Sequence, residues 1–300
     1  MAWVYCKGEL SEDSVPILQV SDRTALYGDG LFETMFAVGE HVAFLSDHLS
    51  RLYESARALR FNQPWTREEF FGEVRAGVTR LLQKHGGKFA RVRLTLSRGT
   101  GVFSPSFLPE QPAVWFAVAD AYDPVPPKRR SDGWSVGLVS FPRNERSPIH
   151  RHKTCNYLEN LLGREEGIAS GYDEMLFLNL AGRLCEGTTT NLFVLKEQRL
   201  ITPPLEDGIL PGVARGHMLL VAEKQNLRPL RRSLNLRELM TCDEAFLTNS
   251  IIGVMPITRF MSLTLGDGKI GKFTKLLCKA FFKEQERSFD PNATLDDLPF

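Results

Sequence analysis

The sequence lacks the features that mark disulfide-rich proteins, zinc proteins and common hydrolases. Its five cysteines are scattered and never spaced as CxxC, so neither a disulfide framework nor a thiolate zinc site is indicated. The six histidines do not fall at metal-ligand spacing, and neither GxSxG nor HExxH occurs. We therefore expect reduced thiols and no bound metal, and the hydrolase and metalloenzyme classes are weakly supported.

Net charge and long apolar runs are also missing. The 37 basic and 36 acidic residues leave a formal charge of +1, which gives no long-range field to attract nucleic acid or an anionic membrane. The opening stretch MAWVYCKGELSED has no sustained apolar core, and no later segment approaches the roughly 20 apolar residues that span a bilayer. We expect a soluble, cytoplasmic protein with no nucleic-acid or membrane partner.

The composition is that of an ordinary globular protein with a single break in the chain. Its 300 residues, 43% of them hydrophobic, suffice for one large or two medium domains. The stretch DAYDPVPPKRRSDG combines three prolines, a basic run and a closing glycine, as linkers do. The pattern predicts a small α+β domain over residues 1–122, a linker over 123–130 and a larger mixed domain over 131–300.

Periodicity places the main elements within these domains. In the first domain a helix opens at Ser46 or Asp47, between short strand-like runs. In the second, LFLNLAGRLCEG predicts a hairpin, and the last residues, FDPNATLDDLPF, an extended tail. Three further helices are expected near residues 156–168, 213–225 and 272–287.

One lysine lies in an unusual setting, in the stretch HRHKTCNYLENLLG. An amine must be neutral to attack a carbonyl, and the cations between Arg143 and His152 would lower the pKa of Lys153. Asn156 and Glu159 have the spacing of a helix-capping pair, which would hold the lysine at a helix entrance. A solvated basic loop is the alternative that these residues leave open.

Three later loops carry polar groups suited to a binding site, although ordinary loops and caps have the same composition. LCEGTTTNLF presents Glu186 beside three threonines, and GILPGVARGHMLL opens a helix whose amides at Val213 and Ala214 would suit a phosphate. The TNS stretch ends an apolar strand at Ser250. By contrast, GTGVFS and GDGKIGKF only approximate nucleotide-binding motifs, and we interpret the first as an ordinary loop and the second as chance.

Six motifs in order carry a resemblance to a known family: SDRTALYGDGLFET, LSDHLSRL, HKTCNYLENLL, LCEGTTTNLF, ILPGVAR and EAFLTNSIIGVMPIT. The set resembles the fold-type IV, or class IV, pyridoxal phosphate enzymes, which include branched-chain and D-amino acid aminotransferases and 4-amino-4-deoxychorismate lyase. The match runs from about Ser21 to about Thr258. It implies a two-domain fold with a small α+β domain and a larger, barrel-like mixed domain, pyridoxal 5'-phosphate as cofactor, and a homodimer.

The resemblance also implies a role for each matched position. Lys153 would form the Schiff base and then move the substrate proton, and Glu186 would keep the pyridine nitrogen protonated. The phosphate would be bound by Arg51, by the amides of Val213 and Ala214 and by the Ser250 hydroxyl, and Tyr157 would approach the phenolic oxygen.

Substrate contacts separate the activities within this family. The Arg-x-His pair of D-amino acid aminotransferases is absent from RGTGVFSPSF, and the Tyr-x-Arg pair of branched-chain aminotransferases is reduced to Phe89 and Arg91. The motifs GDGLFET and FLTNSIIGVMPIT are most similar to the lyase, in which Thr34 would relay a proton to the departing pyruvate. We favour the lyase, with Arg91 or Arg98 holding a substrate carboxylate. A class IV aminotransferase for branched-chain or aromatic L-amino acids, using 2-oxoglutarate, and, more remotely, a non-catalytic relative stay open.

Overall fold

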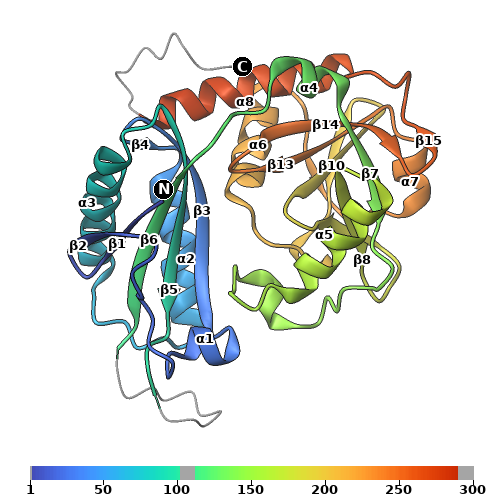
Figure 1. Ribbon diagram of the computed structural model, residues 1–300. Coiled ribbons are helices and arrows are strands. Elements are labelled where there is room, and N and C mark those ends of the chain that lie inside the picture. The colour runs from blue at the N-terminus through green and yellow to red at the C-terminus, as the bar shows by residue number, and fades with distance from the viewer. Residues whose placement is uncertain (1, 102–111, 290–300) are drawn as a thin grey trace. The chain divides into compact units, whose positions relative to one another are not determined.

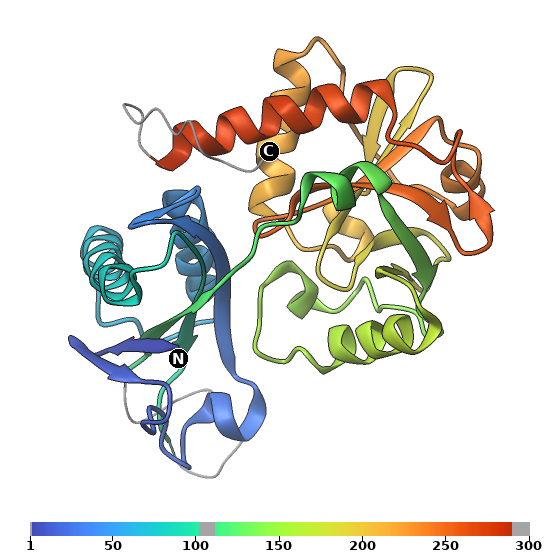
Figure 2. The same ribbon diagram turned by 45° about the horizontal axis from the view of Figure 1, so that its top comes forward.

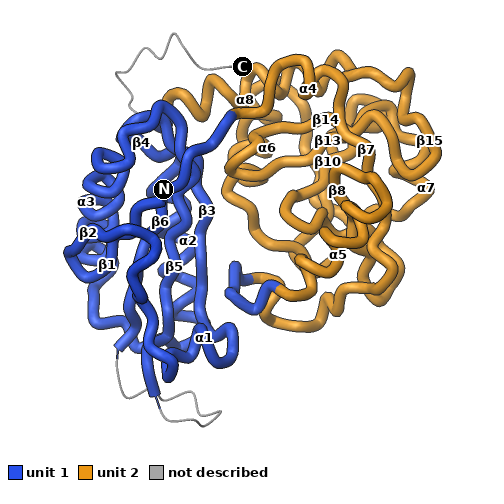
Figure 3. Tube along the Cα trace, in the orientation of Figure 1, with its two compact units in different colours: residues 1–123, 152–157, 288–291 blue, residues 124–151, 158–287, 292–300 orange. Residues whose placement is uncertain are grey.

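The chain divides into two compact units. The computed structural model describes residues 2–101 and 112–289, so the expected tail beyond Phe289 and most of RGTGVFSPSF lie outside the described residues. Unit 1 takes the described residues up to Asp123, the segment His152–Tyr157 and the last two residues of the final helix (Figure 3). Unit 2 takes Pro124–Arg151 and Leu158–Arg287. The segment His152–Tyr157, expected in the larger domain, therefore belongs to the smaller unit.

Unit 1 is an antiparallel sheet with two helices on one face (Figures 1 and 2). Its strand order is β2-β1-β6-β5-β3-β4. The helices α2 (Leu45–Ala58) and α3 (Arg67–His85) share one apolar core with the sheet, and the short α1 (Arg23–Tyr27) precedes β3. The strands are β1 (Trp3–Cys6), β2 (Glu9–Glu12), β3 (Gly30–Val38), β4 (His41–Val42), β5 (Phe89–Ser97) and β6 (Val114–Ala121).

Side chains alternate between the two faces of this sheet, as the pleat of a strand requires. On β3 and β5 the helix-covered face buries residues such as Leu31, Met35 and Leu94. The intervening residues face away from α2 and α3; on β3 they include Phe32 and Thr34. Several predicted functional residues therefore share the face of the sheet that the helices leave uncovered.

The packing of α3 on the sheet depends on one glycine. A Cβ added at Gly77 would lie 2.5 Å from Cε1 of Tyr5 and 2.6 Å from the Trp115 ring, which stack on each other with centroids 5.3 Å apart. Gly72, one turn earlier in the same helix, has no heavy atom within 4 Å of its added Cβ. Both glycines are helical, but only at Gly77 would an added methyl group clash with neighbouring side chains.

We predict opposite effects of alanine at these two positions. Gly77→Ala should lower the free energy of unfolding by about 1–3 kcal/mol, because the methyl group forces the aromatic pair or the helix to move. Gly72→Ala should raise it by about 0.5–1 kcal/mol through helix propensity. Urea unfolding of both variants measures the difference, and destabilisation by Gly72→Ala would contradict the assignment.

Unit 2 is built around a strand ring. Its nine-stranded sheet has the order β12-β11-β10-β13-β14-β7-β8-β9, and an additional pairing of β9 with β10 closes a ring of six strands. The strands are β7 (Trp134–Leu138), β8 (Glu174–Leu178), β9 (Leu184–Gly187), β10 (Asn191–Lys196), β11 (Arg199–Thr202), β12 (Leu230–Arg231), β13 (Glu244–Asn249), β14 (Gly253–Phe260) and β15 (Leu263–Thr264), the last paired with β14.

Helices surround this ring, and two of the helices predicted from the sequence are confirmed. Helix α6 (Val213–Lys224) and helix α8 (Lys272–Phe289) begin where the sequence places them, and Lys224 pairs with Glu284 between them. The predicted hairpin is also confirmed, as β8 and β9. The remaining helices are α4 (Pro127–Asp132), α5 (Leu158–Ser170), α7 (Leu236–Met240) and the 3-10 turns Pro148–Arg151 and Leu205–Asp207.

Two predicted boundaries are wrong. The expected linker contains α4, because a proline in the first turn of a helix is preorganised for helical backbone and loses no hydrogen bond there. The helix expected from residue 156 begins at Leu158 instead. Within residues 2–101 and 112–289, no helix is long and apolar enough to cross a membrane.

Candidate active site

Backbone pairing with β3 holds the Lys153 segment in unit 1. The amide of Phe32 donates to the carbonyl of Lys153 at 2.8 Å, and the amide of Cys155 donates to the carbonyl of Gly30 at 2.8 Å. Gly28, in left-handed backbone at φ +65°, allows the close approach, because a Cβ there would lie 3.2 Å from the backbone of Asn156. The lysine is thus positioned by strand pairing.

The predicted capping pair does not provide this positioning. Helix α5 starts after Asn156, and the Glu159 carboxylate accepts from Nε of Arg143 at 3.1 Å. Arg143, expected to lower the pKa of Lys153, has carboxylate partners of its own. The local pattern was correct about a fixed lysine but wrong about the cause, because the pairing partner lies more than a hundred residues away in sequence.

Aromatic rings surround the Lys153 amine. Its Nζ lies 4.4 Å from the ring centroid of Phe32 and 5.5 Å from that of Tyr157. The two rings meet edge to face with centroids 5.3 Å apart. Unit 1 thus brings together the lysine and tyrosine that the resemblance assigns to the cofactor.

Thr34 lies on the same strand face as Phe32. Its side chain is half-buried, and its hydroxyl has no hydrogen-bond partner in the part of the chain that the structure describes. The hydroxyl therefore has its hydrogen-bonding capacity free on this face of the sheet.

The two arginines expected to bind substrate have other partners. Arg91 is half-exposed and forms two hydrogen bonds to Asp120, the shorter at 2.5 Å. Arg98 is 2% exposed, its Nε donates to Asp29 at 2.8 Å, and its remaining nitrogens donate to the carbonyls of Leu59 and Arg60 at 3.1 Å. These contacts give Arg98 a structural role in joining α2 to the strand end.

Arg51, the expected phosphate ligand, is held by a buried carboxylate. Glu33 accepts from Nε of Arg51 at 2.8 Å and from its Nη2 at 2.5 Å, and Nδ1 of His48 lies 2.6 Å from the same carboxylate. Burial alone would raise the pKa of Glu33, but Arg51 and His48 lower it to about 2. Burial lowers the pKa of His48, so the imidazole is neutral at pH 7.

We predict that Glu33 makes stability depend on pH in the acid range. Its folded-state pKa lies below the ordinary 4.5, so its contribution is complete above pH 4.5 and is lost as the pH falls toward 2. The free energy of unfolding should fall by about 3 kcal/mol more across this window in the wild type than in Glu33→Gln. Urea unfolding at pH 6, 4 and 2 measures this gap, and parallel pH profiles would contradict the prediction.

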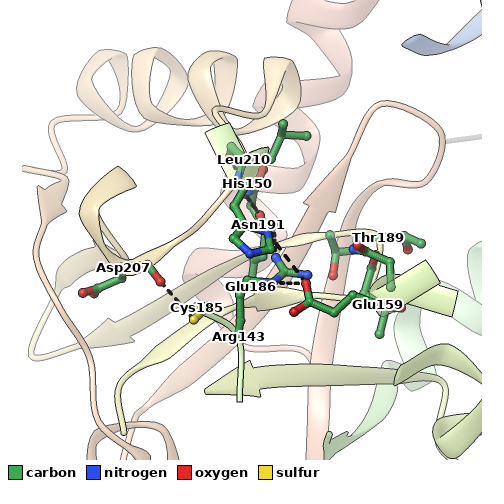
Figure 4. Close-up of polar contacts among 12 residues, drawn as sticks. Arg143, His150, Glu159, Cys185, Glu186, Thr189, Asn191, Asp207 and Leu210 are labelled. Carbon is green, nitrogen blue, oxygen red and sulfur yellow. Dashed lines mark hydrogen bonds and ion pairs between the residues drawn. The ribbon is translucent and has the colours of Figure 1, made fainter. Parts of the chain in front are cut away.

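In unit 2, Glu186 lies where the strand ring closes (Figure 4). It is paired in register with Asn191, whose Nδ2 donates to Oε2 at 2.8 Å, and the amide of Leu210 donates to the same oxygen at 3.0 Å. Nη1 of Arg143 donates to Oε1 at 2.6 Å, and Arg143 stacks on Phe177. Both oxygens are thus held by donors, an arrangement that suits an anion facing a protonated nitrogen.

Glu174, which no sequence motif indicated, organises the loop after Glu186. This carboxylate is 1% exposed and accepts from the hydroxyls of Thr188, Thr189 and Thr190 at 2.5, 3.0 and 3.1 Å. The carbonyl of Thr189 in turn accepts from Nδ2 of Asn249, directly before Ser250. Three consecutive threonines after a strand were the available signal, since buried hydroxyls require an acceptor.

The expected phosphate-binding groups also lie in unit 2. Helix α6 begins at Val213 after Gly212, which offers no side-chain cap, so the amides of Val213 and Ala214 are not covered by one. Ser250 lies in the turn that follows β13, and Arg215 is buried in the first turn of α6, where burial lowers its pKa to about 10. The Arg215 guanidinium donates to the Thr202 hydroxyl at 3.2 Å and to the Pro203 carbonyl at 2.9 Å, so the groups that fit a phosphate here are the amides and the hydroxyl.

The predicted residues therefore fall into two sets. Unit 1 holds the amine, the tyrosine, the threonine and the arginines: Lys153, Tyr157, Thr34, Arg51, Arg91 and Arg98. Unit 2 holds the carboxylate and the remaining phosphate donors: Glu186, Val213, Ala214 and Ser250. Taken by chemistry, the sets fit the aldehyde, ring nitrogen and phosphate of a phosphorylated pyridine aldehyde. The structure shows no cluster of metal-ligating side chains in residues 2–101 and 112–289.

Comparison with known proteins identifies the class. Residues 30–260 match the family described as Amino-transferase class IV, and the chain belongs to this family. It is 28% identical over 285 residues to the aminodeoxychorismate lyase of Bacillus subtilis, covering 94% of each chain. It is 29% identical over 307 residues to the branched-chain-amino-acid aminotransferase-like protein 2 of Arabidopsis thaliana, covering 99% of this chain and 52% of that one.

Solved structures agree with the family. The branched-chain aminotransferase of Thermoproteus uzoniensis, solved with norvaline, is 27% identical, has a TM-score of 0.84 and is matched over 97% of its length and 96% of this chain. The protein is thus an enzyme of the class IV fold that uses pyridoxal phosphate. Relatives of similar identity carry the names of a lyase and of aminotransferases, so the reaction depends on the substrate contacts.

Proposed function

We propose that this enzyme is a lyase that converts 4-amino-4-deoxychorismate to 4-aminobenzoate and pyruvate. The observation that carries the proposal is Thr34. Its half-buried hydroxyl has no partner among the described residues, and it lies on the strand face of Phe32, whose ring contacts the Lys153 amine. This position suits a proton relay beside the lysine.

Each residue has a defined part in this proposal. The Lys153 amine takes the ring proton next to the substrate nitrogen, and the Thr34 hydroxyl gives a proton to the leaving three-carbon group. When bound, pyridoxal phosphate supplies an electron sink for the pair of electrons released. Glu186, held by Arg143 and Asn191, keeps the ring nitrogen protonated, and loss of pyruvate leaves an aromatic ring.

A class IV aminotransferase acting on branched-chain or aromatic L-amino acids is the second candidate. It is favoured by the names of relatives such as the Thermoproteus uzoniensis enzyme. Arg91 counts against this candidate. It is the remaining half of the Tyr-x-Arg pair, but its guanidinium is bound to Asp120.

The reaction type can be read from product formation. The cofactor-loaded enzyme, given aminodeoxychorismate and no keto acid, should release equal amounts of 4-aminobenzoate and pyruvate. Thr34→Val should lower kcat by about 100-fold or more, as expected for loss of a proton donor, while Thr264→Val on the exposed β15 should not. No product together with rapid amino transfer from L-leucine to 2-oxoglutarate would establish the aminotransferase instead.

We also propose that the enzyme works as a homodimer in the cytoplasm. The five cysteines are all free, as fits a reducing compartment, which cell fractionation would test. Helix α5 exposes an apolar stripe, as expected where a second copy binds: Leu158, Leu161, Leu162 and Ile168.

The dimer proposal predicts a change in mass. Light scattering should give twice the chain mass for the wild type, and Leu161→Glu should shift the protein toward the monomer, because a charge would be desolvated in the interface. Glu165→Gln, at another exposed position of α5, is the matched control. A wild-type monomer at micromolar concentration would contradict the dimer.

A further inference from the structure

The first turn of α6 contains a buried arginine that has no carboxylate partner. Arg215 is the third residue of this helix and is 6% exposed. Its Nε donates to the Thr202 hydroxyl and its Nη2 donates to the Pro203 carbonyl, and neither acceptor carries a formal charge. Among residues 2–101 and 112–289, no acidic side chain forms an ion pair with Arg215.

Two other buried arginines have the partners that a buried charge normally requires. Arg143 pairs with Glu159 and Glu186, and Arg98 pairs with Asp29. Removing a charge from water is costly unless an opposite charge and good hydrogen bonds compensate for it. Since the guanidinium of Arg215 has neutral acceptors alone, its charge is incompletely compensated within the described residues.

Charged groups beyond ion-pair distance act on Arg215 in both directions. Burial, followed by repulsion from Arg231, lowers its pKa to about 10, while attraction to Glu186 and Glu206 opposes the shift. The guanidinium is therefore still charged at pH 7. Because Glu186 already pairs with Arg143, it offers Arg215 little further compensation.

This charge lies at the end of α6 that is itself positive. The peptide dipoles place about half a positive charge at a helix N-terminus, and Gly212 provides no side-chain cap for the amides there. The Cβ of Arg215 lies 3.4 Å from the position that a Cβ on Gly212 would take, and helical side chains lean toward the N-terminus. Two positive groups thus share one turn, which is unfavourable until an anion binds there.

We propose that the charge of Arg215 strengthens binding of the cofactor phosphate at the start of α6, and so makes the enzyme prefer pyridoxal 5'-phosphate to unphosphorylated pyridoxal. The Nε and Nη2 donors are bound to Thr202 and Pro203, so Arg215 acts through its charge, while the helix amides and the Ser250 hydroxyl make the contacts. Solvent and salt screen a buried charge weakly, so its attraction for a dianion extends over several ångströms.

The inference rests on the proposed assignment of the phosphate to this helix end. It does not depend on which reaction the enzyme catalyses, because the lyase and the aminotransferase bind the same cofactor. Failure of the lyase proposal would appear as absence of pyruvate in the product assay, whereas failure of this inference would appear in cofactor binding alone.

The test compares the cofactor with the same aldehyde lacking its phosphate. The full chain is freed of cofactor, and the dissociation constants of pyridoxal 5'-phosphate and pyridoxal are measured from the absorbance of the bound aldehyde. The ratio of the two constants isolates the contribution of the phosphate. Arg215→Gln removes the charge and keeps a side-chain donor, so it should reduce this ratio by about 10-fold. The constant for pyridoxal should change by less than about twofold.

Three further variants separate the charge from the contacts. Arg215→Lys keeps the charge and Thr202→Val removes one acceptor, so both should retain the ratio within about threefold. Arg228→Gln removes an exposed arginine beyond the C-terminal end of α6 and should leave both constants unchanged. Urea unfolding shows whether each variant folds. If Arg215→Gln does not, retention of the ratio in Arg215→Lys and Thr202→Val supports the proposal, and its loss in either contradicts it.

Two results with Arg215→Gln would overturn the proposal. Equal weakening of both aldehydes would mean that Arg215 only supports the fold of α6, and an unchanged ratio would mean that its charge does not act on the phosphate. Ser250→Ala tests the phosphate assignment separately, because loss of a hydroxyl contact should lower the same ratio by about threefold to 10-fold. If Ser250→Ala lowers the ratio and Arg215→Gln does not, the phosphate assignment stands and the role of Arg215 is rejected.

Discussion

The short pairing of the Lys153 segment with the start of β3 is the constraint on which the candidate site depends. The chain leaves unit 1 at Asp123, returns for six residues and leaves again, and during this return two backbone hydrogen bonds join it to Gly30 and Phe32. The lysine is thereby tied to the strand that carries Thr34 on one face and Glu33 on the other. The pleat puts Phe32 and Thr34 on one face of β3, and the Lys153 amine lies 4.4 Å from the Phe32 ring, so the amine and the hydroxyl are on the same face.

A second constraint, the closure of the strand ring, positions the candidate site residues of unit 2. Pairing of β9 with β10 puts Glu186 opposite Asn191, and the same asparagine also donates to the carbonyl of Leu210 shortly before α6. The carboxylate and the helix N-terminus are therefore parts of one hydrogen-bonded network. Arg143 and Glu174 support it from neighbouring strands and loops, since a buried carboxylate is stable only when its oxygens have donors.

Features that depend on residues close in sequence could be predicted, and features that depend on distant residues could not. The hairpin of β8 and β9 and the start of α6 at Val213 depend on neighbours within a few residues, and the sequence patterns located both. The carboxylate partners of Arg143 and the role of Glu174 could not be found in this way, because the interacting residues lie 14 to 43 positions apart. The capping interpretation of Glu159 failed for the same reason: its competitor was an arginine outside the local window.

The sequence by itself determined the family, through the order of six motifs, and with it the lysine and the carboxylate assigned to the cofactor, because those residues are recognised by local patterns that do not depend on packing. Only the tertiary structure decided which carboxylate neutralises each of Arg51, Arg91 and Arg98. Asp29, Glu33 and Asp120 are distributed along the chain. The register of β5 and β6 sets Arg91 opposite Asp120, whereas the packing of α2 on the sheet brings Arg51 to Glu33. An ion pair forms only when the two charged groups lie within about 4 Å, so it depends on distance in space rather than on distance in sequence.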